Sequence, residues 1–447
     1  MNEILSRAPV CVSIPNSKLK FSGEAVAGGG GAGAAGTPTH TAAKPRFSGS
    51  VLASLGTNAK YAAASPSVDF ETGEILGLEI PYSPMLARVQ RFALQSVARK
   101  SLPKSRTNNC LRLRQKNKDV EVWQSKEFKT AAYAGLQTCG SVWACPVCAA
   151  KIAERRRSEI ISAMSTHKAS GGTVSLLTLT APHSRTDKLV DLLGMQSKAL
   201  KFFWKDFSAS KVFKEMGIIG QIRALEVTHG RKSASNNGWH PHYHILQFGG
   251  VGVDLGLFTA SQMAEWAERL YIRWAACCVR AGLSAPSREH GLKLDDGSKA
   301  SRYVAKWGLE DEMTKGHTKK SAQGETPFDF LRSHLADSSD KQALALFKEF
   351  AEGFKGKRQL HWSHGLKKHF AIGEASDEEL SVMMDDYAEL LGTITLEQWR
   401  SVLRADVRGE VLQLAASGGW LAVSLFLQSL PKYSKEIHEP ISSCLHQ

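Results

Sequence analysis

The sequence predicts an α+β chain in which a central antiparallel sheet is flanked by helices that cover one side of it. Strands are indicated first by residues 173–180, a β-branched and alternating run. A polar turn joins the apolar runs 218–228 and 239–248, which predicts a hairpin. Helices are indicated by residues 187–208 and 261–282, which separate the strands. A short strand is predicted at Leu292–Leu294 and a further helix from Ser298 to about Met313.

The 447 residues divide into four predicted parts. Residues 1–80 contain a Gly/Ala-rich stretch with too few large apolar side chains to bury a core, which predicts a disordered tail. Residues 81–170 form a basic, cysteine-containing element with helices at 83–107 and from Ala149 to about Lys168. Residues 171–372 hold the sheet, and residues 373–447 form an acidic, helical C-terminal region that is a candidate for homodimer or host contacts.

Charge is the most unusual bulk property of the chain. The formal net charge is +14, and residues 81–170 carry 17 Lys and Arg against 5 Asp and Glu. Residues 374–447 instead carry 5 basic against 12 acidic side chains. A basic block of this size indicates a polyanionic partner, most often nucleic acid, although a solvated basic face is the alternative.

No segment at the start of the chain resembles a secretory signal, which predicts a cytoplasmic protein. The window from Val411 to Leu430 is uncharged and long enough to span a bilayer. Its polar residues and the pair Gly418-Gly419 favour two buried helical halves over a membrane span, so no membrane partner is expected.

Three histidines alternate in the segment Trp239–Leu246. Because successive side chains of a strand point to opposite faces, His240, His242 and His244 share one face. Imidazole is the commonest metal ligand, so the pattern favours a divalent ion over hydrogen-bonded core histidines. Glu226 on the neighbouring strand and His240 both compete to be the third ligand, and two imidazoles with a carboxylate would suit Mg²⁺ or Mn²⁺.

Four of the eight cysteines lie in the basic block. Cys145 and Cys148 have the C-x₂-C spacing of a zinc knuckle, and Cys139 and Cys110 complete four thiolates, with Cys110 the most distant. Such a closed site predicts structural Zn²⁺, with buried free thiols as the alternative. Basic residues that follow the knuckle are expected to contact DNA: Lys151, Arg155, Arg156 and Arg157.

Tyr303 and Lys306 stand three residues apart in a predicted helix, so the phenol and the ammonium share one face. A tyrosine can act as a covalent nucleophile when a nearby metal or cation lowers the cost of its deprotonation, and Lys306 could stabilise charge on a phosphoryl oxygen. Alone, a tyrosine in such a helix is usually part of the core, and only the histidines make it a catalytic candidate.

In this order, the motifs resemble the rolling-circle replication initiators of plasmids and phages, which belong to the HUH endonuclease superfamily. The resemblance covers about residues 105–370. It rests on six stretches: the cysteine cluster, 177–180, 238–244 with the His-hydrophobic-His motif His242-Tyr243-His244, 300–306, 326–331 and 355–363.

This resemblance implies an HUH-type nuclease domain and a site-specific DNA nickase and ligase. It implies that Tyr303 attacks a phosphate of single-stranded DNA, giving a 5′-phosphotyrosine and a free 3′-hydroxyl that host polymerase and helicase use. A relaxase, a single-strand transposase and a non-catalytic DNA-binding regulator remain as alternatives. Where the family carries a glutamate one helical turn before the tyrosine, this chain has Lys299, so Glu310, Asp295 and Asp296 are the candidates for the terminating cleavage.

Overall fold

The computed structural model describes six stretches of the chain: 84–125, 130–233, 236–250, 259–296, 324–384 and 387–431. The predicted tail at 1–80 and the predicted helix from Ser298 to Met313 therefore lie outside the described residues. All described residues belong to one of the two units into which the chain divides, Phe47–Gln447.

The larger sheet has five strands, and each of its pairings is antiparallel, as predicted. Its spatial order is β6 (Leu292–Asp296), β3 (Thr173–Thr180), β5 (Trp239–Gly249), β4 (Gly220–His229) and β7 (Leu360–Trp362). The predicted hairpin is confirmed by the pairing of β4 with β5 over their full length, from Gly220 with Phe248 to His229 with Trp239. The central position of β5 places the alternating histidines in the middle of the sheet.

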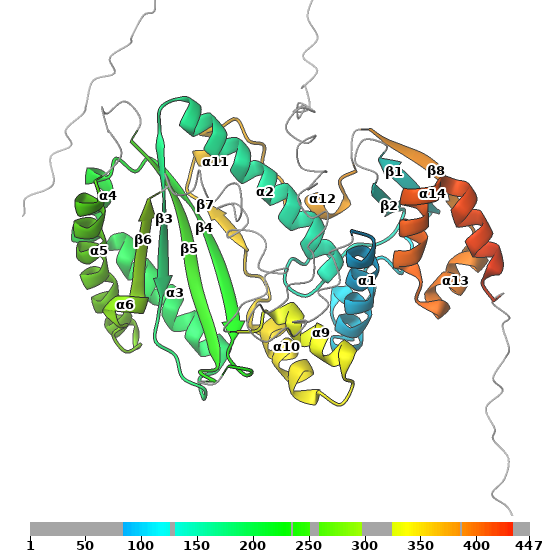
Figure 1. Cartoon of the computed structure of the whole chain (residues 1–447), viewed down its shortest axis with the longest axis horizontal. Coiled ribbons are helices and arrows are strands. Elements are labelled where there is room, and N and C mark those ends of the chain that lie inside the picture. The colour runs from blue at the N-terminus through cyan, green and yellow to red at the C-terminus, as the bar shows by residue number, and fades with distance from the viewer. Residues whose placement is uncertain are drawn as a thin grey trace, which may run out of the picture. The chain divides into compact units, whose positions relative to one another are not determined.

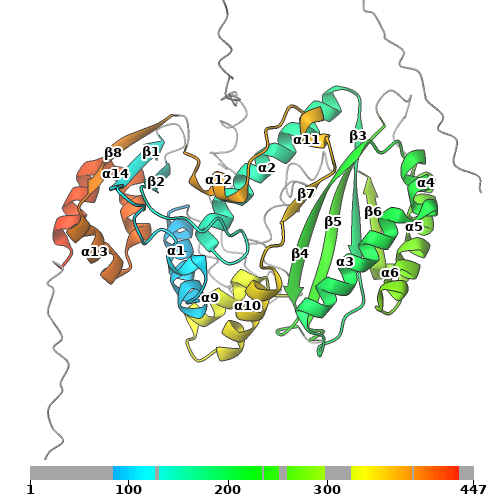
Figure 2. The same cartoon turned by 180° about the vertical axis from the view of Figure 1, so that it is seen from behind.

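Helices cover both faces of this sheet, so the expectation that they cover one side is wrong. One face packs on α3 (Leu189–Lys205), α4 (Phe207–Glu215) and α5 (Ala260–Ala281), and the other packs on α2 (Pro146–Ala169) and α11 (Leu366–His369). Figures 1 and 2 show α3 and α2 on opposite sides of the strands. The reason lies in the strands themselves: neighbours such as Ile245 and Leu246 are both fully buried, which is typical of strands enclosed on both faces.

Local capping decides where the helices begin and end. The predicted helix 187–208 is two helices, because Asp206 leaves the helical conformation and its carboxylate accepts a hydrogen bond from the Ala209 N–H at the start of α4. Helix α5 begins with a capping box between Thr259 and Gln262 and ends at Gly282, which adopts the left-handed conformation with φ of 96°.

The ends of the described chain form a second, three-stranded sheet in the order β2 (Thr130–Ala134), β1 (Val120–Ser125) and β8 (Ala388–Ile394). The C-terminal region is therefore not only helical, because β8 pairs with a strand more than 260 residues earlier. Around this sheet lie α1 (Pro84–Ser101), η2 (Arg106–Asn108), α12 (Asp377–Val382), α13 (Leu396–Ala405) and α14 (Arg408–Ser429). The boundaries at 170/171 and 372/373 stay predictions.

Helix α14 is broken at Gly419, where φ is 63° and ψ is −158°, as the Gly-Gly pair predicts. By length and composition it could cross a membrane, and among the described helices it alone passes that test. Val411, Leu412 and Ala415 of its first half are buried in the core that the two sheets share with α1.

Three more helices separate strands of the larger sheet in the sequence: α6 (Arg288–Gly291) precedes β6, and α9 (Pro327–Ala336) and α10 (Lys341–Gly353) precede β7. The stretch 326–331 forms the capping box of α9, in which Thr326 pairs with Asp329. Phe330 of the same helix packs against Trp239 at 5.8 Å between ring centroids, next to the start of the histidine strand. The stretch 355–363 contributes β7 to the sheet edge.

Candidate metal centres

Glu226, His242 and His244 converge on one face of the central strands. Glu226 of β4 lies directly opposite His242 of β5, and His244 follows two residues later, opposite Thr178 of β3. The Nε2 atoms of His242 and His244 lie 3.3 and 3.5 Å from Glu226 Oε2. The three ligand atoms all lie within 4.8 Å of one another, so the hairpin assembles a possible three-ligand metal site.

The other nitrogen of each imidazole also has a partner. His244 Nδ1 lies 3.1 Å from Thr178 Oγ1, and His242 Nδ1 lies 3.3 Å from the carbonyl oxygen of His240. When each Nδ1 donates its proton to these oxygens, Nε2 keeps the free lone pair that a metal requires. This arrangement is the usual way in which a protein orients a ligating histidine.

The spacing of the three ligands fits a divalent ion. Bonds of about 2.1 Å hold neighbouring ligand atoms about 3.0 Å apart in an octahedron and about 3.4 Å apart in a tetrahedron. The separations of 3.3 and 3.5 Å to Glu226 fall close to these values. Only one face of the ion would be covered by these ligands, because all three project from the same side of the sheet, so a substrate oxygen has room to bind.

His240 lies outside this group. Its Nδ1 is 2.6 Å from Nε2 of His183, whose Nδ1 in turn lies 2.8 Å from the carbonyl oxygen of Asn237. Burial, together with the neighbouring His242 and His183, lowers the pKa of His240 to about 3, so its imidazole is neutral. The geometry thus favours Glu226 over His240 as the third ligand.

Sequence reasoning missed His183. The feature of the sequence that could have revealed it is its position three residues after Thr180, which ends the strand that pairs with His242. A histidine just beyond that strand end is brought to the same edge of the site as His240.

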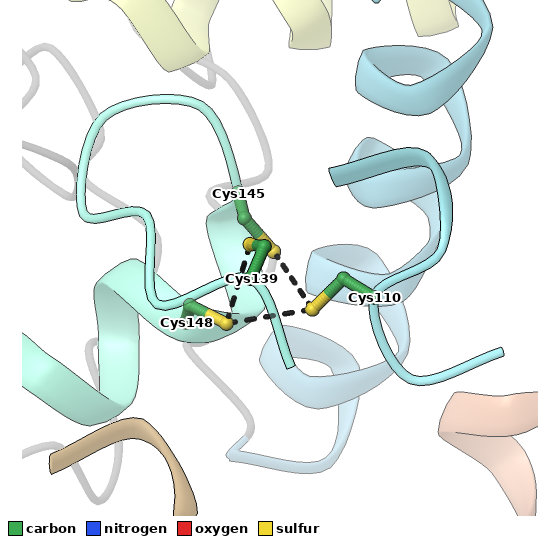
Figure 3. A group of neighbouring side chains, drawn as sticks. All are labelled: Cys110, Cys139, Cys145 and Cys148. Atoms are coloured by element: carbon green, nitrogen blue, oxygen red, sulfur yellow. Dashed lines mark hydrogen bonds between the residues drawn. The ribbon is translucent and has the colours of Figure 1, made fainter. Parts of the chain in front are cut away.

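The four predicted zinc ligands also converge, in the buried group shown in Figure 3. Cys110 follows η2 and Cys139 follows β2, while Cys145 is the N-cap of α2 and Cys148 lies in its first turn. The Sγ–Sγ distances are 3.5 Å for Cys110 to Cys148, 3.7 Å for Cys139 to Cys148 and 3.8 Å for Cys145 to Cys110. Zinc–sulfur bonds of about 2.3 Å in a tetrahedron place the sulfurs about 3.8 Å apart, so this group can bind zinc.

The electrostatics of the four cysteines also favour a bound cation. The pKa of Cys110 is raised above its usual value, first by hydrogen bonding to the Cys139 thiol and further by the other thiols and by burial. Four thiolates this close together repel one another, so a bound cation is required to hold them all deprotonated.

The predicted DNA contacts occupy different environments on α2. Arg156 donates to Glu159 at 3.1 Å, to Asp377 at 3.0 Å and to the Ala375 carbonyl at 2.8 Å. Its guanidinium therefore holds α2 against the segment before α12, and this position gives no support to a role in DNA binding. Arg155 likewise donates to the Met383 carbonyl, and Arg157 lies 3.8 Å from Glu154. Burial lowers the pKa of Lys151.

The predicted nucleophile Tyr303, its companion Lys306, and the residues Lys299 and Glu310 lie outside the described residues. Asp295 of β6 is described: it pairs with Leu176 of β3 in register and lies 2.9 Å from Lys293 Nζ. Because Leu176 and Thr178 alternate with Leu177 along β3, Asp295 shares the sheet face of the three metal ligands. Asp296 is the last residue of β6.

Part of this chain matches a known family of replication proteins. Residues 133–271 match the family model described as "Replication protein", and this stretch contains Glu226, both ligating histidines and three of the four clustered cysteines. The predicted resemblance to plasmid replication initiators is thereby confirmed.

Two relatives come from streptomycetes. The chain is 27% identical over 345 residues to "Protein rep" of Streptomyces lividans, an alignment that covers 62% of this chain and 74% of that protein. It is 31% identical over 179 residues to "Neomycin resistance protein" of Streptomyces cyanogenus, which covers 32% of this chain and 40% of the relative. No solved structure matches the chain.

Proposed function

We propose that this protein is a plasmid replication initiator that nicks one strand of the replication origin and remains covalently attached to it. The observation that carries the proposal is the group Glu226, His242 and His244 at the centre of the sheet of a replication protein. On this proposal residues 171–372 are an HUH-type nuclease domain, the enzyme acts in the cytoplasm, and host helicase and polymerase continue replication from the nick.

Each described ligand has a separate task in this reaction. Glu226 supplies the negative charge that offsets a divalent ion, and the two imidazoles fix its position because Thr178 and the His240 carbonyl orient their rings. A bound Mg²⁺ or Mn²⁺ would act as a Lewis acid that polarises the scissile phosphate. His183 and His240 form a hydrogen-bonded pair beside this group, at the start of β5.

Tyr303 is the proposed nucleophile. Its phenolic oxygen loses its proton to solvent and attacks the phosphorus, forming a Tyr–O–P bond as the P–O3′ bond breaks. The 3′-oxygen takes up a proton and becomes the free 3′-hydroxyl, and the DNA 5′ end stays on the protein. Lys306 stabilises the charge on the phosphoryl oxygens, and reversal of the same step rejoins the strand.

The test is to incubate the protein with labelled single-stranded origin oligonucleotides and Mn²⁺ and to look for a covalent adduct. We expect the label on the peptide that contains Tyr303, and no adduct from Tyr303→Phe although that variant still binds the oligonucleotide. Tyr387→Phe removes a phenol that is exposed in the C-terminal region and serves as the matched control. His242→Ala and His244→Ala should each abolish cleavage.

A normal adduct from Tyr303→Phe would refute the proposed nucleophile, and cleavage by both histidine variants would place the metal elsewhere. Origin binding without any adduct from the unmodified protein would instead support the non-catalytic regulator. Nicking at a transfer origin or a transposon end, and not at a replication origin, would support a relaxase or a transposase.

A further inference from the structure

Arg408 is the first residue of α14, and its side chain is completely buried. Its guanidinium donates to the side-chain oxygen of Gln95 at 2.7 Å, to the Leu111 carbonyl at 3.2 Å and to Ser96 Oγ at 3.2 Å. A cation at the beginning of a helix is unfavourable, because the helix dipole is positive there. A buried guanidinium in that place needs a compensating negative charge nearby.

The one carboxylate that pairs with Arg408 in the described part of the chain does not supply enough negative charge to compensate the guanidinium. Asp406 lies 3.3 Å from Arg408 and 3.8 Å from Arg112, so two guanidiniums share it, and its side chain is 40% exposed. Arg99 adds a further positive charge, which lowers the pKa values of Arg112 and Arg408 in addition to the effect of burial. This buried corner has an excess of positive charge.

The missing negative charge lies on the other side of Gln95. The amide of Gln95 accepts from Arg408 with its oxygen and donates with its nitrogen to Cys145 Sγ at 3.2 Å. Gln95 is itself fully buried, so it can turn to no other partner. A divalent ion with four thiolates has a net charge of −2, and N–H donors to the sulfurs stabilise such a centre.

We propose that Arg408 and Gln95 couple metal binding at the four cysteines to the docking of the C-terminal region, residues 388–430. The loaded centre attracts the buried cation of α14, and Gln95 transmits the interaction as a pair of hydrogen bonds. Coupling is reciprocal, so removal of either side weakens the other. This inference concerns the cysteine centre alone and is independent of the nuclease proposed above.

The first test measures metal affinity. Thiolate-to-Cd²⁺ charge-transfer absorption reports loading, and competition with a chelator gives the dissociation constant. Arg408→Met should weaken binding by about 10- to 100-fold, the usual effect of removing a residue that supports a metal ligand. Arg404→Met removes an exposed guanidinium from the same region and should leave the affinity unchanged. Equal affinities for the two variants would overturn the proposal.

The second test needs no substitution. Hydrogen exchange of the unmodified protein is followed with the metal bound and after chelation. We expect α13 and α14 to lose protection on chelation, whereas β3 and β5 keep theirs and serve as the internal reference. Unchanged protection of α13 and α14 without metal would refute the coupling, even if Arg408→Met failed to fold.

A separate observation points to a binding groove of about 510 Å³ between α3 and α5, on the face of the sheet opposite Glu226 and the histidines. Its cations include Arg273, which is neutralised by Asp206 at 2.5 Å. The other three are Lys201, Lys205 and Arg280, and no ion pair among the described residues involves them. Arg280 lies over the Phe202 ring at 4.1 Å, and Phe207 beside the groove is 83% exposed.

We infer that this groove binds single-stranded DNA, with phosphates on Lys201, Lys205 and Arg280 and a base stacked on Phe207. A positively charged groove with an exposed aromatic ring is the usual combination for such strands. The inference rests on DNA being the partner in the proposed function, and it places a second contact region away from the metal site.

The experiment measures anisotropy of a labelled oligonucleotide of random sequence at several salt concentrations. Joint replacement of Lys201, Lys205 and Arg280 by Ala should lower the slope of log K against log salt by about 2, and Phe207→Ala should weaken binding about tenfold. Replacement of three other exposed lysines, Lys341, Lys348 and Lys368, is the control. An unchanged slope would refute the role of the groove in DNA binding. Normal nicking of a short origin oligonucleotide by the same variant would show that the proposed function does not depend on the groove.

Discussion

Arg231 offers a test of how the fold holds the end of the β4–β5 hairpin. Its guanidinium lies 2.5 Å from Glu325 and 2.9 Å from Asp340, and its side chain is 5% exposed. Asp340 also caps α10 by accepting from the Ala343 N–H, and Glu325 forms an isolated bridge with His229 at the end of β4. Arg231 thus ties the hairpin to the chain that precedes α9 and α10.

Arg231→Met should destabilise the protein strongly. The substitution leaves two carboxylates without their main partner, and Glu325 is 9% exposed. Breaking a buried ion pair costs about 3–5 kcal/mol, and we expect the lower end, about 3 kcal/mol, because Asp340 is partly exposed. Lys232 contacts the same carboxylate at 3.0 Å but is 60% exposed, so Lys232→Met should cost less than about 1 kcal/mol.

Urea unfolding of the two variants, followed by tryptophan fluorescence, gives the free energies of unfolding. The pH dependence adds an independent check. Burial would raise the pKa of Glu325, but hydrogen bonds from Arg231 and Lys232 lower it below its usual value. A lowered folded-state pKa contributes stability above the unfolded pKa of about 4.3 that is lost as the pH falls through the folded value. Similar losses from both variants, or a stability that does not fall in acid, would show that the ion pairs are not what fixes this hairpin.

The remaining predictions concern the two metal centres. Glu226→Gln keeps the shape of the side chain but removes the negative charge beside His242 and His244. The Mn²⁺ affinity measured by calorimetry should therefore fall by at least tenfold, whereas His240→Asn should have little effect on it. The opposite ranking of the two variants would make His240 the third ligand. Cys139→Ser should reduce Cd²⁺ charge-transfer absorption and lower the melting temperature, since three thiolates hold the ion less tightly; an unchanged spectrum would remove Cys139 from the site.

The sequence predicted those features of the two metal centres that depend on residues close together in the chain. The alternation of His242 and His244 defines their common face, and the antiparallel pairing of β4 with β5 brings Glu226 beside them. The C-x₂-C spacing similarly predicted that Cys145 and Cys148 would lie together. In each case the chemistry is set by positions a few residues apart.

Contacts between distant segments could not be predicted in this way. Residues 388–394 read AELLGTI, a composition that favours helix, yet they form β8 because β1 offers a strand edge for pairing. The second layer of helices over the sheet was also missed: α2 directly precedes β3 but packs on the face opposite α3. The ion pair of Arg156 with Asp377, more than 200 residues away, could not be predicted either.

These distant contacts explain why the stretch that matches replication proteins is not sufficient for its own metal centre. Residues 133–271 contain Cys139, Cys145 and Cys148 but not Cys110, and Gln95 and Arg408 also lie outside. The same stretch holds β3, β4 and β5 but neither of the outer strands β6 and β7. The fourth thiolate and the buried cation come from opposite ends of the described chain, so on the proposed coupling the cysteine centre reaches its full metal affinity only when both ends pack around it.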